Sequence, residues 1–157
     1  MAILIPNCVG FISALPQISN TDRKTWYQRL DKAPWNPPSW VFGPAWTILY
    51  TMMGVSSWLV WRDRTAGSAR VNALIIYAVQ LLINFMFTPV FFGLRKLGIS
   101  LVIVLALWFM VIGMMASFAQ VSPLACWLLV PYILWVTYAL SLNIWIWAKN
   151  PEPNRSD

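Results

Sequence analysis

The stretch WNPPSWVFGPAW, residues 35–46, holds three tryptophans and three prolines in twelve positions. Pro37 and Pro38 cannot lie inside a helix, but they suit its first turn, where a missing N–H removes no hydrogen bond. Trp35 and Trp40 are amphipathic and suit the headgroup level of a bilayer. The stretch therefore predicts a stiff, aromatic start to a transmembrane helix.

The composition around this stretch is typical of an integral membrane protein. The chain has 157 residues, of which 59% are hydrophobic and 10% charged, and its mean hydropathy is +0.63. Soluble domains carry roughly a quarter charged residues. The net charge is +6, but the basic residues lie between apolar runs, so anionic lipid and topology explain them better than nucleic acid does. We therefore expect a lipid bilayer as partner and no nucleic acid.

Five apolar runs reach, or nearly reach, the roughly 20 residues that a helix needs to cross the hydrocarbon core. They are residues 2–19, 40–61, 71–94, 98–118 and 124–148. The first run lacks the basic start of a cleaved leader and contains Pro6 and Pro16, so we expect it to be retained. The sequence predicts an all-α integral membrane bundle of five transmembrane helices in a single domain, with a longer loop at 20–39 and a polar tail at 149–157.

Lysine and arginine are distributed unevenly between the two sides of the predicted bundle. One side receives Arg23, Lys24, Arg29, Lys32, Arg95, Lys96, Lys149 and Arg155, and the other receives Arg62, Arg64 and Arg70. Because basic residues concentrate in cytosolic loops, we predict that the C-terminus and the 20–39 loop are cytosolic.

Pro44, Pro89 and Pro131 lie within the second, third and fifth runs. Each removes a backbone hydrogen bond. Two interpretations stay open, namely kinks that splay the bundle around a ligand and plain helix curvature.

Polar and aromatic side chains share faces on three of the predicted helices. These residues are Phe42, Trp46 and Tyr50 on the second, Gln80, Asn84, Phe87 and Phe91 on the third, and Trp135, Ala139, Leu142 and Asn143 on the fifth. A side-chain amide in hydrocarbon is costly unless paired, so the amides should face inward. Two interpretations again stay open. The rings wall a cavity for a flat apolar ligand with a polar edge, or they pack the bundle while the amides bond between helices.

Residues that commonly carry catalysis or bind metals are scarce. The chain has no His, and its five acids (Asp22, Asp31, Asp63, Glu152, Asp157) lie in loops or in the tail. Paired carboxylates for acid–base catalysis and an intramembrane acid for an ion-driven pump are both absent. Cys8 and Cys126 have no metal-binding spacing. We expect no metal and no cofactor.

Several ordered motifs resemble the translocator protein family, also known as tryptophan-rich sensory proteins or peripheral-type benzodiazepine receptors. The motifs are Trp26-Tyr27, residues 32–40 (KAPWNPPSW), residues 43–46 (GPAW), Gln80 with Asn84, residues 89–93 (PVFFG), residues 121–125 (VSPLA), Pro131-Tyr132 with Trp135, and Leu142-Asn143. They run nearly from end to end of the chain, which makes the resemblance far more specific than any single motif.

The resemblance implies a five-helix bundle, often a homodimer, with a ligand cavity beneath the first loop. Family ligands include protoporphyrin IX and related tetrapyrroles, cholesterol, and synthetic isoquinoline carboxamides and benzodiazepines. Positions that match the family pocket are Trp46, Tyr50, Asn84, Phe87, Trp135, Ala139 and Leu142, and we add Phe42 from the same helical face. Trp26 and Tyr27 match a loop region that covers the pocket, and we group Trp35 and Trp40 with them as lid residues.

Three functions follow as expectations. The first is a membrane receptor or carrier for tetrapyrroles and similar apolar ligands. The second is a light-dependent porphyrin-degrading enzyme, because Trp46 and Trp135 match tryptophans linked to that reaction in some members. The third is a ligand-sensing membrane interaction protein. The implied membrane is the mitochondrial outer membrane in animals and a cell-envelope membrane in bacteria.

One departure from the animal members concerns sterol binding. Their cholesterol-recognition pattern needs a Tyr and a basic residue where this chain has Ile144 and Ala148. We therefore do not expect strong sterol binding through that element, whereas tetrapyrrole binding is less affected; a sterol stays among the ligands that the resemblance implies.

Overall fold

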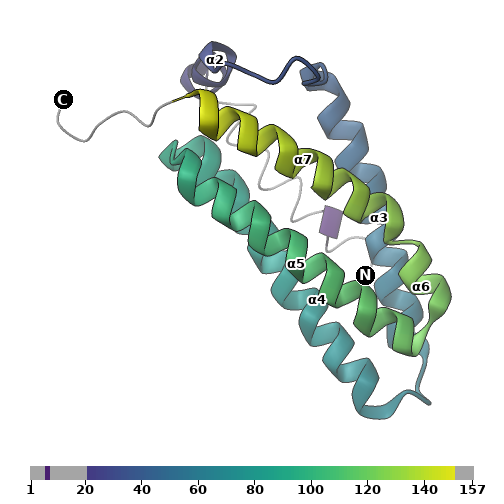
Figure 1. Cartoon of the computed structure of the whole chain (residues 1–157). Coiled ribbons are helices and arrows are strands. Elements are labelled where there is room, and N and C mark those ends of the chain that lie inside the picture. Colours follow the sequence, from purple (N-terminus) through teal and green to yellow (C-terminus); the bar gives the residue numbers. More distant parts are fainter. Residues whose placement is uncertain (1–5, 8–20, 151–157) are drawn as a thin grey trace.

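The computed structural model describes residues 6–7 and 21–150, and the described residues contain helices and connecting segments but no strand. The helices are α2 (Thr21–Arg29), α3 (Ser39–Arg62), α4 (Gly67–Thr88), the π-helical η1 (Pro89–Leu94), α5 (Leu97–Val121), α6 (Pro123–Trp127) and α7 (Val130–Lys149) (Figure 1). The first predicted run lies outside the described residues except for Pro6 and Asn7, which are helical. The predicted 20–39 loop contains a helix, α2.

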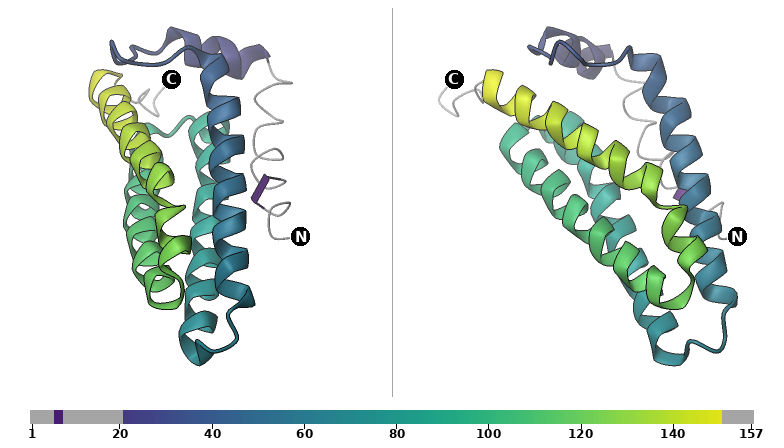
Figure 2. Two further views of the ribbon diagram at one scale, coloured as in Figure 1. Left: turned by 90° about the vertical axis from the view of Figure 1, so that its right-hand side faces the viewer. Right: turned by 45° about the vertical axis from the view of Figure 1, so that its right-hand side comes forward.

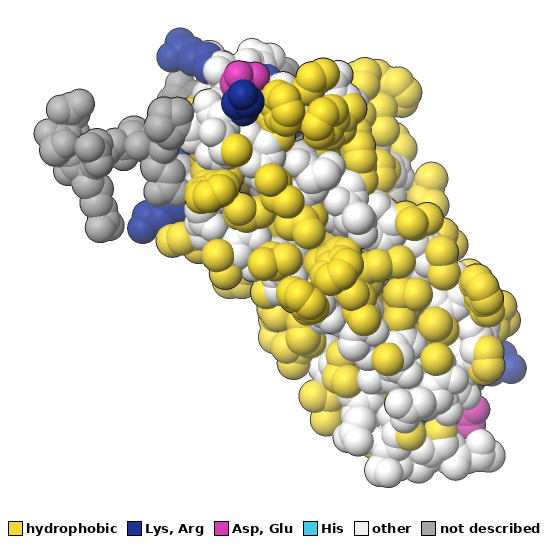
Figure 3. All heavy atoms as spheres, in the orientation of Figure 1, with side chains coloured by type: hydrophobic (Ala, Val, Ile, Leu, Met, Phe, Trp, Pro, Cys, Tyr) yellow, Lys and Arg dark blue, Asp and Glu magenta, His cyan; other side chains and the backbone are white. Residues whose placement is uncertain are grey.

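Three helical stretches of the described chain are long and apolar enough to cross a membrane: Gly67–Leu94, Leu97–Val121 and Pro123–Lys149. Helix α3 has 24 residues, which is about 36 Å at the usual rise per residue. On the face shown in Figure 3, charged side chains gather at the two ends of the molecule, and apolar side chains cover the length between them. The predicted all-α membrane bundle is confirmed.

Helix α5 is central to the packing of the described helices. It runs along α4 on one side and along α7 on the other, while α3 contacts mainly α4 and α6 and meets α7 only briefly. Figure 2 shows that α3 and α7 diverge from the α6 end of the bundle toward the α2 end. The separation between α3 and α7 therefore grows toward the α2 end, and side chains or other segments must fill or cover the interval between them.

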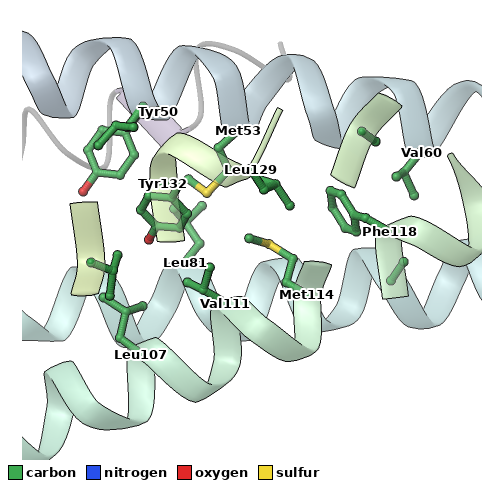
Figure 4. Close-up of a cluster of buried hydrophobic side chains, with 14 residues drawn as sticks. Tyr50, Met53, Val60, Leu81, Leu107, Val111, Met114, Phe118, Leu129 and Tyr132 are labelled. Atoms are coloured by element: carbon green, nitrogen blue, oxygen red, sulfur yellow. The ribbon is translucent and has the colours of Figure 1, made fainter. Parts of the chain in front are cut away.

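The half of the bundle near α6 is tightly packed. Met53 and Val60 of α3 meet Met114 and Phe118 of α5 there, and none of these four side chains is exposed (Figure 4). The buried hydroxyl of Ser56 donates to a backbone carbonyl of α6 and so ties α3 to that short helix. A ligand site is therefore better accommodated in the other half, where α3 and α7 diverge.

Pro131 divides the fifth predicted run into two helices. Helix α6 ends at Trp127, and Pro131 lies in the first turn of α7. Because proline has no N–H, Pro131 cannot bond back to the carbonyl of Trp127. The N–H of Leu129 bonds instead to the carbonyl of Cys126 at 3.0 Å, which tightens the junction. The structure thus differs from the single helix predicted over this run.

The other two prolines behave differently from each other. Pro44 lies inside α3, which continues past it. Pro89 begins η1, a six-residue π-helical segment that continues α4 and ends at Arg95 in a left-handed conformation with φ 55°. The wider η1 turn carries Phe91, which is only 3% exposed, to the end of the bundle near α2.

Candidate functional site

Aromatic side chains from α3 and α7 meet where the two helices begin to diverge. We call them the ring group: Phe42, Trp46 and Tyr50 of α3, with Tyr132, Trp135 and Tyr138 of α7. The three rings of α3 are four residues apart in the sequence, which puts them on one face of the helix. Trp46 lies 5.2 Å from Tyr50 and 6.5 Å from Trp135, centroid to centroid, and the two indoles are nearly perpendicular at 87°. Phe42 also meets Trp135, at 5.9 Å.

Two amides of α4 lie against the inner side of the ring group. The Asn84 amide donates to the Tyr132 hydroxyl at 3.0 Å, and the Gln80 amide donates to the same oxygen. Tyr50 of α3 lies beside Asn84. All four side chains are buried, and Gln80 and Tyr132 are not exposed at all. The amides thus face inward and bond between helices, which joins α4 to α7.

A groove of about 440 Å³ opens beside the ring group, between α3 and α7. Its lining is almost wholly apolar and consists of Ala45, Ile48, Leu49, Pro131, Leu134, Trp135 and Tyr138. Ile48 is 59% exposed and Leu134 is 64% exposed, so the groove opens toward the lipid. The buried indole N–H of Trp135 has no hydrogen-bond partner among the described residues. The space beside the rings is therefore a side-opening, apolar groove.

The predicted pocket residues do not all lie together. Phe42, Trp46, Tyr50, Trp135 and Asn84 form one contiguous group, as described above. Phe87 instead stacks on Phe91 at 5.4 Å, close to α2. Ala139 is half-buried and Leu142 is buried, both farther along α7 toward its C-terminal end. No predicted pocket residue is exposed, and the set extends from the groove to the underside of α2.

Helix α2 lies on η1 through aromatic contacts. Trp26 meets Phe91 edge-on at 5.7 Å, and Tyr27 meets Phe92 at 5.6 Å. The guanidinium of Arg95 lies 5.7 Å from the Trp26 ring. Burial in this position raises the pKa of the Tyr27 hydroxyl above its ordinary value. Two of the predicted lid residues therefore cover the η1 end of the bundle.

The segment after α2 is attached to the far end of α7. The Asp31 N–H donates to Oδ1 of Asn150 at 2.8 Å, and Nδ2 of Asn150 donates back to the Asp31 carbonyl at 3.0 Å. The Tyr138 hydroxyl donates to the Trp35 carbonyl at 2.6 Å, and the Trp35 ring meets Trp145 at 5.2 Å. We call these three hydrogen bonds the latch. Residues 21–38 thus bridge from η1 to α7 above the interval between α3 and α7 (Figure 1).

Trp40 does not take part in this cover. It lies in the first turn of α3 and is 74% exposed. This position fits the interfacial placement predicted for it better than a role as a lid residue.

Basic side chains surround the end of the bundle that lies beneath residues 21–38, which we call the covered end. Arg29, Lys32, Arg95, Lys96 and Lys149 lie in the helices and connecting turns that meet there, and among the residues of these segments whose side chains the structure describes the one acid is Asp31. Among the described residues, no three His, Cys, Asp or Glu side chains are grouped as metal ligands would be. The covered end therefore offers cations and aromatic surface to a ligand.

Sequence reasoning left three residues of this site out of the predicted set: Tyr132, Tyr138 and Asn150. Tyr132 lies three positions before Trp135 and seven before Ala139, so helical spacing alone could have placed it on the same face. Tyr138 and Asn150 bond to backbone groups of residues more than a hundred positions away, and no sequence pattern signals such partners.

Comparison with known proteins gives consistent matches over most of the chain. The sequence model of the TspO/MBR family matches residues 2–148. The translocator protein of Bos taurus is 38% identical over 148 residues, which cover 94% of this chain and 86% of that protein. The tryptophan-rich sensory protein of Cereibacter sphaeroides is 42% identical over 118 residues, or 75% of this chain and 72% of that protein. The tryptophan-rich protein TspO of Chlorobaculum tepidum is 35% identical over 148 residues, which cover 92% of this chain and 94% of that protein.

Proposed function

The chain belongs to the TspO/MBR family of multi-pass membrane proteins, and on this premise we propose that it is a membrane receptor or carrier for tetrapyrroles such as protoporphyrin IX. The family resemblance carried by the sequence motifs is confirmed. In the proposal the ligand binds at the ring group and the adjoining groove. Flat apolar compounds of the benzodiazepine type fit the same surface. A homodimer with a cytosolic C-terminus is part of the proposal.

The observation that carries the proposal is the meeting of Trp46 and Trp135 beside Asn84. Two indoles from different helices offer faces and edges to a conjugated ring system, and each aromatic contact adds about 0.5–1.5 kcal/mol beyond area burial. The groove volume of about 440 Å³ lies within the usual range for ligand pockets, roughly 300–1,000 Å³. The indole N–H of Trp135 is buried and has no partner among the described residues, so it reaches a polar group of the ligand only if the surrounding rings shift.

The basic side chains and the latch at the covered end are the second part of the proposal. A porphyrin carries propionates, and the basic side chains of α2, of the turn after η1 and of the end of α7 attract them at long range. The latch holds residues 21–38 across the site, so opening of this segment controls how fast the ligand leaves.

The test is a titration of the purified protein with protoporphyrin IX, followed by the shift of the porphyrin absorbance band. Wild type is compared with Trp46→Phe, Trp135→Phe and Asn84→Ala, and with Trp127→Phe as a matched control. Trp127 is 71% exposed on α6 and remote from the ring group. We expect Kd to rise for each ring-group tryptophan by at most about 12-fold, because Phe keeps part of an aromatic contact whose complete loss costs about 0.5–1.5 kcal/mol. Unchanged affinity in all three site variants contradicts the proposed location.

A second candidate function is light-dependent breakdown of bound porphyrin. The edge-to-face contact of Trp46 and Trp135 at 6.5 Å favours it, because neighbouring indoles can pass an electron to a photoexcited ligand. The assay follows porphyrin absorbance under illumination in air. Turnover predicts faster loss with wild type than with the Trp46→Phe/Trp135→Phe double variant. Equal bleaching by both proteins and by free porphyrin removes this candidate and leaves binding, transport or sensing.

A further inference from the structure

A second hollow lies at the other end of the bundle, where α3 is followed by α4 and where α6 begins. Its volume is about 580 Å³. Its lining is amphipathic, with Leu59 and Leu124 on the apolar part and Arg62, Asp63, Arg64, Thr65 and Ser122 on the polar part. We call it the arginine hollow. In Figure 3, charged side chains lie at this lower end, at the margin of the apolar surface.

The two arginines of this hollow have open hydrogen-bonding capacity. The Arg62 guanidinium lies 4.9 Å from the centroid of the Trp58 ring, and neither it nor Arg64 has a carboxylate partner among the described residues. The one carboxylate in the lining, that of Asp63, accepts from the Thr65 N–H at 3.0 Å and from the Thr65 hydroxyl at 2.6 Å. A guanidinium presents a planar fork of donors that matches phosphate oxygens. The hollow is therefore prepared for an anion with several oxygens.

Tryptophans around the hollow indicate its depth in the bilayer. Trp58, Trp61 and Trp127 are 43%, 58% and 71% exposed and belong to the last turns of α3 and to α6. Exposed tryptophans concentrate at the headgroup level of membranes. The arginines therefore lie at the level of lipid phosphates, and Leu124, which is 60% exposed, lies beside them as apolar surface.

The excess of Lys and Arg in the cytosolic loops of membrane proteins does not account for these arginines. They lie at the end that carries fewer basic residues and that we predict to face away from the cytosol. Three arginines nevertheless fall within nine consecutive residues there, Arg62 to Arg70. A local ligand accounts for such clustering better than topology does.

We propose that the arginine hollow binds an anionic phospholipid, with its phosphate on Arg62 and Arg64 and an acyl chain along Leu59 and Leu124. The apolar wall distinguishes a lipid from a free phosphate, since inorganic phosphate has nothing to place on the leucines. The site is separate from the ring group and does not depend on the proposed tetrapyrrole function.

Native mass spectrometry of the full chain, released from detergent that contains equal amounts of phosphatidylglycerol and phosphatidylcholine, tests the proposal. We expect wild type to retain phosphatidylglycerol preferentially. Each of Arg62→Gln and Arg64→Gln should lower that preference about fivefold, the effect of one basic residue at a lipid surface, and the double variant about 25-fold. The matched control is Arg70→Gln, which removes a basic residue from the same end of the bundle that does not line the hollow.

The outcomes separate the alternatives. Loss of the preference in Arg62→Gln and in Arg64→Gln, with Arg70→Gln unchanged, supports the proposal. An equal loss in all three single variants overturns it in favour of bulk charge. Displacement of the lipid by inorganic phosphate, together with no effect of Leu124→Gln, also overturns it, because the hollow then recognises phosphate without the lipid chain. Thermal unfolding followed by circular dichroism verifies that each surface variant is folded.

Discussion

The latch between residues 31–35 and α7 leads to a quantitative prediction about ligand kinetics. Replacing Asn150 by Ala removes both hydrogen bonds to the backbone of Asp31. Replacing Tyr138 by Phe keeps the ring and removes only the bond to the Trp35 carbonyl. Ser141→Ala is the matched control, because this hydroxyl bonds within α7 and does not touch the lid.

The expected magnitude follows from the number of bonds lost. A hydrogen bond contributes about 0.5–1.5 kcal/mol net, and these bonds are partly solvent-exposed, so the lower half of that range applies. Tyr138→Phe should favour opening of residues 21–38 by about 0.5–1 kcal/mol, roughly a 2- to 5-fold change. Asn150→Ala removes two such bonds and should favour opening roughly 5- to 30-fold.

Stopped-flow measurement of porphyrin binding and release distinguishes gating from affinity. If residues 21–38 must open for the ligand to pass in either direction, kon and koff rise together and Kd changes little. If the lid itself contacts the ligand, koff rises more than kon. Rates identical to those of wild type and Ser141→Ala would refute the lid mechanism. They would show that the ligand passes through the lipid-facing side of the groove between α3 and α7.

Three further predictions concern packing, pH and salt. Phe118→Ala opens a cavity in the packed half of the bundle and should lower the free energy of unfolding by about 3 kcal/mol or more. Phe109→Ala lies on the same helix but is 61% exposed, so it should lower that free energy little. Thermal unfolding of both variants in one detergent compares them. Burial against η1 raises the pKa of Tyr27, so its contribution to stability is complete below pH 10.0, the ordinary pKa, and is lost as pH rises through the higher folded-state pKa. Tyr27→Phe should flatten this alkaline loss in unfolding midpoints, and an unchanged pH profile would exclude Tyr27 as its source. The porphyrin kon should fall as salt increases because the covered end is basic, and a salt-independent kon would rule out electrostatic steering.

Periodicity and burial cost made much of the ring group predictable. The spacing of Phe42, Trp46 and Tyr50 placed three rings on one side of α3, and the cost of an unpaired amide in hydrocarbon placed Gln80 and Asn84 inside. Both interpretations left open by the sequence are represented in the structure. The amides bond between helices, and the rings also adjoin a groove.

The course of the backbone near the prolines was less predictable. Pro44, Pro89 and Pro131 have the same chemistry, yet the first lies inside an uninterrupted helix, the second begins a π-helical segment and the third separates two helices. Proline chemistry alone does not decide between these outcomes, because they also depend on how each helix packs against its neighbours.

The latch could not be predicted from the sequence either, because its partners lie far apart along the chain. Asp31 and Asn150 are 119 positions apart, and the groups that meet include backbone atoms that every residue possesses. Only the path of residues 30–38 across the bundle brings them together.

A crystal structure of the protein bound to protoporphyrin IX would show whether the ring group is the binding site. We expect the porphyrin ring in van der Waals contact with Trp135 and Trp46, between α3 and α7 and beneath residues 21–38. A porphyrin bound on the outer face of α5, with the ring group and its amide network unchanged, would contradict it.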